Sequence, residues 1–81
     1  MADWRLRSQE AYLKGVEIHL SNYDLVKPDG DHDHCEFCWD KFSHLKKDLQ
    51  AGYCTTDFYR WICEPCYNDF KEMFGWKVVA N

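Results

Sequence analysis

The segment between positions 16 and 21 alternates between apolar and polar residues. Val16, Ile18 and Leu20 are its apolar members. A period of two places successive side chains on opposite faces of an extended chain, so the pattern predicts a strand with one buried face. The polar positions, which are expected to face solvent, are Glu17, His19 and Ser21.

Two stretches carry weaker helical patterns. Residues 3–14 are rich in good helix formers, and Asp3 is a residue type that caps helix N-termini, so a helix is expected there. Further along, Phe42, Leu45 and Leu49 are spaced three and four apart around charged residues. This spacing predicts either a short amphipathic helix on the surface or a loop with helical turns.

The C-terminal part predicts a hairpin followed by a helix. Residues 52–55 and 58–62 are rich in aromatic and β-branched residues and flank a short turn, as the strands of a β-hairpin do. Pro65 suits the first position of a helix, and Gly75 suits its end. The apolar residues at helical spacing between them are Tyr67, Phe70 and Phe74. Residues 76–79 then predict an edge strand.

Four of the five cysteines form two closely spaced pairs. The motifs are Cys35-Glu36-Phe37-Cys38 and Cys63-Glu64-Pro65-Cys66, separated by 24 residues. Two intervening residues allow both sulfurs of a pair to reach one ion, and two such pairs complete the tetrahedral four-thiolate shell of a zinc site. The predicted ligands of one structural zinc ion are Cys35, Cys38, Cys63 and Cys66. A closed shell has no open position for water or substrate, so it predicts no chemistry at the metal.

The size of the chain agrees with a metal-stabilised fold. Its 81 residues fit a single domain, residues 1–81, whose thin apolar core favours a covalent or metal cross-link. Charges interrupt the N-terminal positions where a signal peptide needs an apolar stretch, and no apolar run is long enough to span a bilayer. We therefore expect a cytoplasmic protein without a membrane segment. In a reducing cytosol, an odd number of cysteines favours metal binding over disulfide formation.

The order of the predicted elements resembles that of a treble-clef zinc finger. The first cysteine motif, residues 35–38, forms a turn called the knuckle, a hairpin follows, and the last cysteine lies in the first turn of a helix. The resemblance covers residues 33–75, and residues 1–28 would add a helix and strand extension. It implies a small α+β fold and places the ligands in the two cysteine pairs. Asp31-His32-Asp33-His34 before the first pair and Gly52-Tyr53-Cys54 after it also resemble short, uncharacterised bacterial zinc-binding proteins, which implies no activity. Treble-clef domains serve several functions, so the resemblance does not select one.

Charge and aromatic content favour a protein as the partner. Residues 29–40 carry five acidic residues and no Lys or Arg, within a formal net charge of −4. Four thiolates with one divalent ion would bring the chain to about −6, which repels a polyanion such as nucleic acid. Aromatic residues exceed what a small core hides, and those exposed near the knuckle would form a contact patch. We therefore expect a zinc-binding adaptor that mediates protein–protein interaction and is not an enzyme. The sequence does not determine its oligomeric state.

Three other functions stay open on the sequence alone. The first is nucleic-acid binding, if the fold gathers the basic residues on one face: Lys41, Lys46, Lys47, Arg60, Lys71 and Lys77. The second is dithiol redox chemistry at Cys63 and Cys66, because a proline between cysteines at a helix N-terminus lowers a thiol pKa. The third is a metal-dependent nuclease that uses His32, His34 and the neighbouring aspartates.

The remaining metal-binding residue types have ordinary structural interpretations. Cys54 is expected to be a small core side chain on the hairpin, with an alternative ligand or a reactive thiol as the other interpretations. The acidic stretch around His32 and His34 is expected to be a solvated loop, although it is also a candidate second metal site. Replacement of a cysteine ligand by His32, His34 or His44 is not required, because four cysteines already complete the shell.

Overall fold

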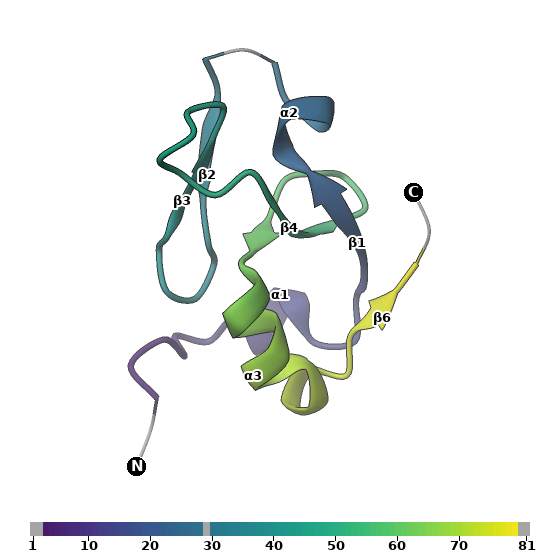
Figure 1. Ribbon diagram of the computed structural model, residues 1–81. Helices are drawn as coiled ribbons and strands as arrows, with labels where there is room; N and C mark the ends of the chain where they lie inside the picture. The colour runs from purple at the N-terminus through teal and green to yellow at the C-terminus, as the bar shows by residue number, and fades with distance from the viewer. Residues whose placement is uncertain (1–2, 29, 80–81) are drawn as a thin grey trace.

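Two small β-sheets form the framework of the protein, whose computed structural model describes residues 3–28 and 30–79. The larger sheet has the strand order β5-β4-β1-β6, and the smaller one pairs β2 with β3 (Figure 1). All neighbours are antiparallel except β1 and β6, which are parallel. The strands are β1 (Glu17–Asn22), β2 (His32–His34), β3 (Lys41–Ser43), β4 (Ala51–Thr55), β5 (Trp61–Ile62) and β6 (Lys77–Val78). The architecture is a small mixed α/β fold.

Among the described residues, three helices accompany the sheets, and only the last is longer than one turn. They are α1 (Glu10–Leu13), α2 (Tyr23–Val26) and α3 (Glu64–Phe74). Pro65 lies in the first turn of α3, where a missing N–H costs nothing. Gly75 ends the helix with φ 63°, and its N–H bonds the carbonyl of Lys71. The sequence prediction of this helix, with its proline start and glycine end, is confirmed.

Aromatic side chains make up most of the core. Phe37 from the first cysteine motif lies 4.8 Å from Phe70 and 5.4 Å from Phe74 between ring centroids, which joins that motif to α3. In the same core, the ring centroid of Trp61 lies 4.9 Å from that of Tyr23 and 5.3 Å from that of Phe42. All of these side chains are buried. Each cluster joins segments that are far apart in the sequence, so the fold depends on long-range packing.

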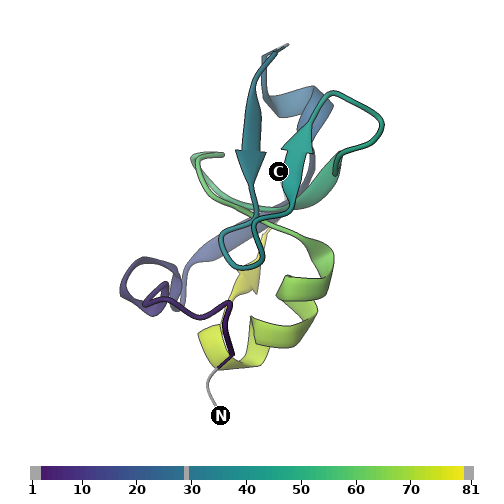
Figure 2. The ribbon, with the colours of Figure 1, turned by 90° about the vertical axis from the view of Figure 1, so that its left-hand side faces the viewer.

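The hairpin and the C-terminal edge strand predicted from the sequence are both confirmed. β4 and β5 pair antiparallel, with Tyr53 opposite Ile62 and Cys54 opposite Trp61. β6 is the edge of the larger sheet, where it lies beside β1. Because β1 connects β4 with β6, the N-terminal segment completes the same sheet that the cysteine-bearing part begins. Figure 2 shows the two-stranded sheet in the upper part of the molecule and α3 in the lower part.

The two weak helical patterns have different outcomes. Within residues 3–14 only α1 is α-helical, so the predicted helix is too long, and Asp3 accepts hydrogen bonds from the backbone and side chain of Arg5 instead of capping a helix. Around Phe42 the surface helix is wrong and the alternative, a loop with turns, agrees with the structure: Phe42 is buried in β3, Leu45 is exposed, and the N–H of Asp48 donates to the carbonyl of Leu45 at 3.0 Å. In both places hydrogen bonding to neighbouring segments outweighs a weak helical spacing.

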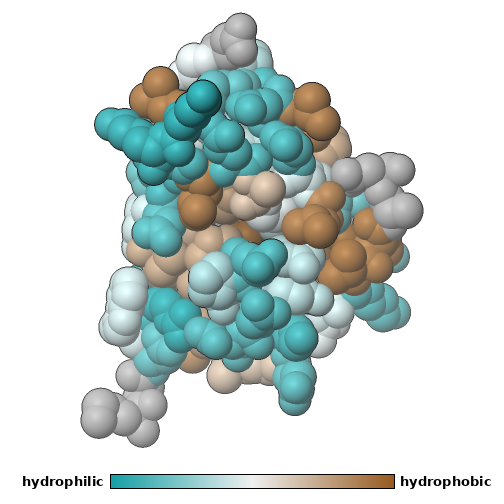
Figure 3. Space-filling view, viewed as in Figure 1, coloured by the Kyte–Doolittle hydropathy of each residue, from teal (hydrophilic) through white to brown (hydrophobic). Residues whose placement is uncertain are grey.

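Strand β1 forms as predicted, but its burial does not alternate. Ile18 is buried, whereas Leu20 on the same face is 54% exposed and His19 on the opposite face is buried. His19 is covered because the β4–β5 loop places Phe58 over its ring at 5.8 Å and Val79 lies beside it. Leu20 on β1 and Val78 on β6 are both exposed apolar residues, and Figure 3 shows hydrophobic surface on the side where these strands lie.

Candidate metal centre

The two cysteine motifs meet at one point because β5 lies beside the first motif. Cys35 and Cys38 lie in the turn between β2 and β3, while Cys63 precedes α3 and Cys66 lies in its first turn. Trp61 of β5 forms an isolated bridge with Cys35, and its carbonyl accepts the N–H of Glu36 at 2.9 Å. These contacts bring both motifs to the same end of β5.

The four sulfurs of this cysteine cluster are close enough to share an ion. All four Sγ atoms lie within 4.8 Å of one another, and those of Cys38 and Cys63 are 3.5 Å apart. A tetrahedral zinc ion with bonds of about 2.3 Å holds its sulfurs about 3.8 Å apart. The cluster therefore fits one metal ion bound by four thiolates, and is consistent with zinc.

Nearby N–H groups support negative charge on these sulfurs. Sγ of Cys35 accepts the backbone N–H of Phe37 and that of Cys63, both at 3.4 Å. Sγ of Cys66 accepts Nη1 of Arg5 at 3.5 Å. Hydrogen bonds to the charged form stabilise it, and such outer partners orient metal ligands. The site is thus arranged for thiolates rather than for four neutral thiols.

The thiols influence one another strongly in the absence of an ion. A hydrogen bond from Cys63 lowers the pKa of Cys35 to about 5. The hydrogen bond that Cys63 donates to Cys35, together with burial, raises the pKa of Cys63 well above its usual range. Burial, followed by the charge of Cys35, raises the pKa of Cys66 to about 12. These shifts favour the thiolate at Cys35 and the protonated thiols at Cys63 and Cys66 when no metal is bound, and a bound cation would replace those protons.

The same convergence argues against an isolated redox dithiol. Cys63 and Cys66 would act alone in such a site, whereas here both sulfurs face the other pair. All five cysteines are free thiols, and the 3.5 Å between Cys38 and Cys63 exceeds the roughly 2.05 Å of a disulfide bond. Cys35, Cys63 and Cys66 are also buried, with only Cys38 half-buried. Reactive cysteines are partly exposed to solvent, whereas burial limits the solvent access of these sulfurs.

Cys54 lies outside the cysteine cluster. It is fully buried on β4, opposite His19 of β1 and Trp61 of β5. Burial raises the pKa of its thiol, so the group is neutral under ordinary conditions. This position matches the expectation of a core side chain on the hairpin.

The histidines do not assemble a second site. Within residues 3–28 and 30–79, the cysteine cluster is the only group of three or more His, Cys, Asp or Glu ligand atoms close enough to hold an ion. His32 and His34 point to one side of β2, whereas Asp33 points to the other, where it bonds Tyr23 at 2.7 Å. His44 faces Asp24 at 2.9 Å. The pleat of β2 separates the imidazoles from the carboxylate that a hard metal would need.

The basic residues named as a nucleic-acid surface are dispersed. Lys41 lies on β3 and Lys77 on β6, at opposite sides of the molecule in Figure 1. Arg60 pairs with Glu36 at 3.2 Å, and Lys71 lies 5.6 Å from the ring of Tyr67. A continuous basic face is not formed by these residues.

Arg5 and Gln9 contribute to the site although sequence reasoning missed them. Arg5 reaches Cys66 and also pairs with Asp3 at 2.7 Å and Asp69 at 2.9 Å. Gln9 is 1% exposed, and its Nε2 donates to the carbonyl of Glu36 at 2.9 Å and to that of Arg5 at 2.7 Å. The hydrogen bonds and ion pairs of Arg5 and Gln9 hold the N-terminal segment against the cysteine cluster and the knuckle. No local pattern marks either residue for this role, because Arg5 and Cys66 are 61 positions apart and Gln9 and Glu36 are 27 positions apart.

Comparisons with family models, curated proteins and solved structures give no match for this chain. None of the helices in the described part of the chain is both long and apolar enough to cross a lipid bilayer.

Proposed function

We propose that this protein is a zinc-stabilised module for protein–protein interaction. Cys35, Cys38, Cys63 and Cys66 bind one structural zinc ion, and the surface beside the knuckle binds a protein partner. The observation that carries the proposal is the convergence of four sulfurs within 4.8 Å in a mostly buried position. Four thiolates complete a tetrahedral zinc shell, so the ion supports the fold and performs no chemistry.

The order of elements supports a treble-clef arrangement for the metal-binding part. The first cysteine pair lies between β2 and β3, the β4–β5 hairpin follows, and α3 carries Cys66 in its first turn. The N-terminal segment then adds β1 to the hairpin. In this arrangement the ion joins the knuckle to α3, two segments that a thin core alone would hold weakly.

The distribution of aromatic residues supports a protein partner. Most aromatic side chains are buried, but Trp39 directly after the knuckle is 60% exposed and Tyr59 on the β4–β5 loop is 66% exposed. Exposed aromatic residues are enriched at the energetic centres of protein interfaces. The net charge of −4, further lowered by four thiolates, disfavours a nucleic acid as the main partner.

The test uses protein purified without added metal. The proposal predicts one zinc per chain, and loss of both metal and cooperative unfolding after chelation or after Cys38→Ser. The matched control is Cys54→Ala, which removes the cysteine outside the cluster and should keep its zinc. Random heptapeptides displayed on phage and selected against the zinc-loaded protein test the binding function. Protein that folds equally well without zinc would refute the structural role, and absence of any selected peptide would refute the binding role.

A further inference from the structure

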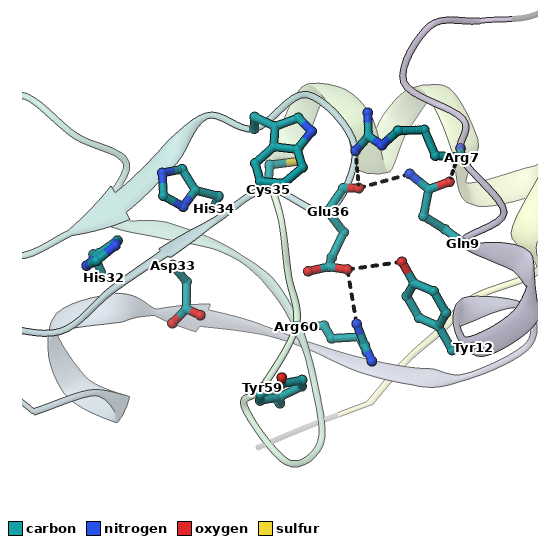
Figure 4. Close-up of a pocket in the computed structure, with 11 residues that line it drawn as sticks. Arg7, Gln9, Tyr12, His32, Asp33, His34, Cys35, Glu36, Tyr59 and Arg60 are labelled. Atoms are coloured by element: carbon teal, nitrogen blue, oxygen red, sulfur yellow. Dashed lines mark hydrogen bonds and ion pairs between the residues drawn. The ribbon is translucent and has the colours of Figure 1, made fainter.

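A pocket lies beside the knuckle and adjoins the cysteine cluster, because Cys35 is one of its lining residues. It has a volume of about 380 Å³ and lies between the N-terminal segment, the β2–knuckle segment and the β4–β5 loop (Figure 4). Its volume lies in the roughly 300–1,000 Å³ range typical of ligand sites. Arg7, His34, Trp39 and Tyr59 are exposed residues of its wall.

The carboxylates in the wall are already neutralised by other side chains. Oε1 of Glu36 accepts Nη1 of Arg60 at 3.2 Å and the hydroxyl of Tyr12 at 3.3 Å, as Figure 4 shows. Asp33 accepts the hydroxyl of Tyr23 at 2.7 Å and pairs with Lys27 at 3.1 Å. Neither carboxylate is therefore available to attract a cation into the pocket.

Donor groups in the wall retain unused capacity. The guanidinium of Arg7 donates one hydrogen bond, from Nη2 to the carbonyl of Glu36 at 3.1 Å, and pairs with no carboxylate among the described residues. Within the same part of the chain, neither the indole N–H of Trp39 nor a ring nitrogen of His34 has a hydrogen-bond partner. With the acceptors satisfied and these donors open, the pocket is complementary to an anionic acceptor such as a carboxylate.

Backbone strain is concentrated around this pocket. The non-glycine residues with positive φ in the described chain are Ser8 at 72°, Trp39 at 70° and Phe58 at 60°. Trp39 belongs to the wall, Ser8 follows Arg7, and Phe58 precedes Tyr59. Glycine adopts this region without steric cost, whereas an L-residue is strained there. Strained residues of this kind cluster at binding sites, where the surrounding structure holds them in place.

Trp39 is the most informative of these residues. Its side chain is 60% exposed, so burial does little to offset the strain of its backbone. The Arg7 guanidinium lies 5.3 Å from its ring, and the ring of His34 lies 6.0 Å away. An exposed indole is thus held beside two groups able to donate to an anion. The arrangement offers an aromatic surface next to an anion site.

We propose that this pocket binds a short peptide segment of the protein partner, in which a carboxylate contacts Arg7 and His34 and an adjoining aromatic side chain stacks on Trp39. The inference rests on the proposed function and names the partner's chemistry. A chain of net charge −4 repels a peptide with one carboxylate only weakly. It repels a nucleic acid more strongly, because every phosphate carries a negative charge. The peptide is therefore the ligand that the charge balance favours.

The decisive variant is Trp39→Gly, which removes the indole and relieves the strain at once. Heptapeptides selected against the zinc-loaded protein should contain an aromatic residue next to Asp or Glu. By fluorescence anisotropy, Trp39→Gly and Arg7→Gln should bind these peptides at least tenfold more weakly than wild type. The matched control is Trp4→Ala, an exposed tryptophan outside this pocket, which should bind as wild type does. Trp39→Gly should keep its zinc and unfold at a higher urea concentration.

Several outcomes would overturn the assignment. Selected peptides that are basic, or that bind Trp39→Gly as tightly as wild type, would place the interface elsewhere and leave the zinc-dependent binding function standing. Tight binding of octauridylate that Trp39→Gly abolishes would replace the peptide with nucleic acid. Loss of zinc or of folding in the wild-type protein would instead refute the proposed function, so the two failures are distinguishable.

Discussion

The guanidinium of Arg5 donates from Nη1 to Sγ of Cys66 at 3.5 Å, although 61 positions separate the two residues. Arg5 is fixed in this position by ion pairs with Asp3 and Asp69, and its guanidinium lies 4.5 Å from the centre of the Phe70 ring. A four-thiolate zinc centre carries a charge of about −2, so a cation at its edge stabilises the bound state.

Replacing Arg5 should weaken metal binding without removing a ligand. In Arg5→Gln the thiolates lose the adjacent positive charge, and Asp3, whose pKa Arg5 lowers to about 2, stays near the site as an unpaired carboxylate. Loss of an outer partner of this kind typically costs about tenfold or more in metal affinity. Competition with a chelating dye measures the change. Arg7→Gln is the control, because Arg7 contacts no cluster sulfur, and an equal loss in both variants would contradict the assignment.

Metal affinity should fall steeply with acidification. The raised pKa values of Cys63 and Cys66 keep both thiols protonated in the metal-free protein at neutral pH, so binding must release at least these two protons. The apparent association constant should therefore fall by about a hundredfold or more for each pH unit lost near neutrality. Proton release measured by calorimetry in buffers of different ionisation enthalpy checks this number. Release of fewer than two protons would show that the thiols are already ionised.

Gln9 should stabilise the fold through its buried hydrogen bonds. Its amide donates to the carbonyls of Arg5 and Glu36 and accepts the backbone N–H of Arg7, so Gln9→Leu removes the side-chain donor of the Arg5 carbonyl, one of the two side-chain donors of the Glu36 carbonyl, and the acceptor of the Arg7 N–H. The expected loss is about 2 kcal/mol in the free energy of unfolding, read from urea denaturation of the zinc-loaded protein. The neighbouring Glu10→Ala lies on an exposed surface and should change stability by less than about 0.5 kcal/mol. Equal effects would show that the contacts of Gln9 are dispensable.

A side chain at Gly52 should destabilise the fold, because Phe42 and the backbone of Ile62 lie close to this position on β4. A Cβ at this position would lie 2.7 Å from Cε2 of Phe42 and 2.9 Å from the carbonyl oxygen of Ile62. Gly52→Ala should destabilise the protein by about 1–3 kcal/mol. Combining it with Phe42→Leu should cost less than the sum of the two single changes, because the smaller side chain gives up part of the clash. Additive effects would mean that Phe42 does not limit this position.

The sequence was most informative where the signal is local. Both cysteine motifs, the proline start of α3 and its glycine end depend on residues a few positions apart, and the structure has them where expected. The same holds for the β4–β5 hairpin. Such features are set by short-range geometry, so their spacing alone is enough to predict them.

The parts that could not be predicted depend on long-range contacts. Residues 3–9 contain helix formers, but Arg5 and Gln9 bond the cysteine cluster and the knuckle, which holds this segment outside a helix. The alternation predicts a buried Leu20, yet Leu20 is exposed on the larger sheet while Phe58 covers His19. The positive φ of Trp39 has no sequence signal either, because glycine is the usual residue in that conformation.

Zinc-edge X-ray absorption spectroscopy of protein purified without added metal shows directly which atoms surround the ion. A four-cysteine zinc site predicts one zinc per chain surrounded by four sulfur atoms at about 2.3 Å, with the same spectrum in Cys54→Ala. A nitrogen or oxygen atom in the first coordination shell of the wild-type protein, or a spectrum that changes in Cys54→Ala, would contradict the assignment of Cys35, Cys38, Cys63 and Cys66 as the complete ligand set.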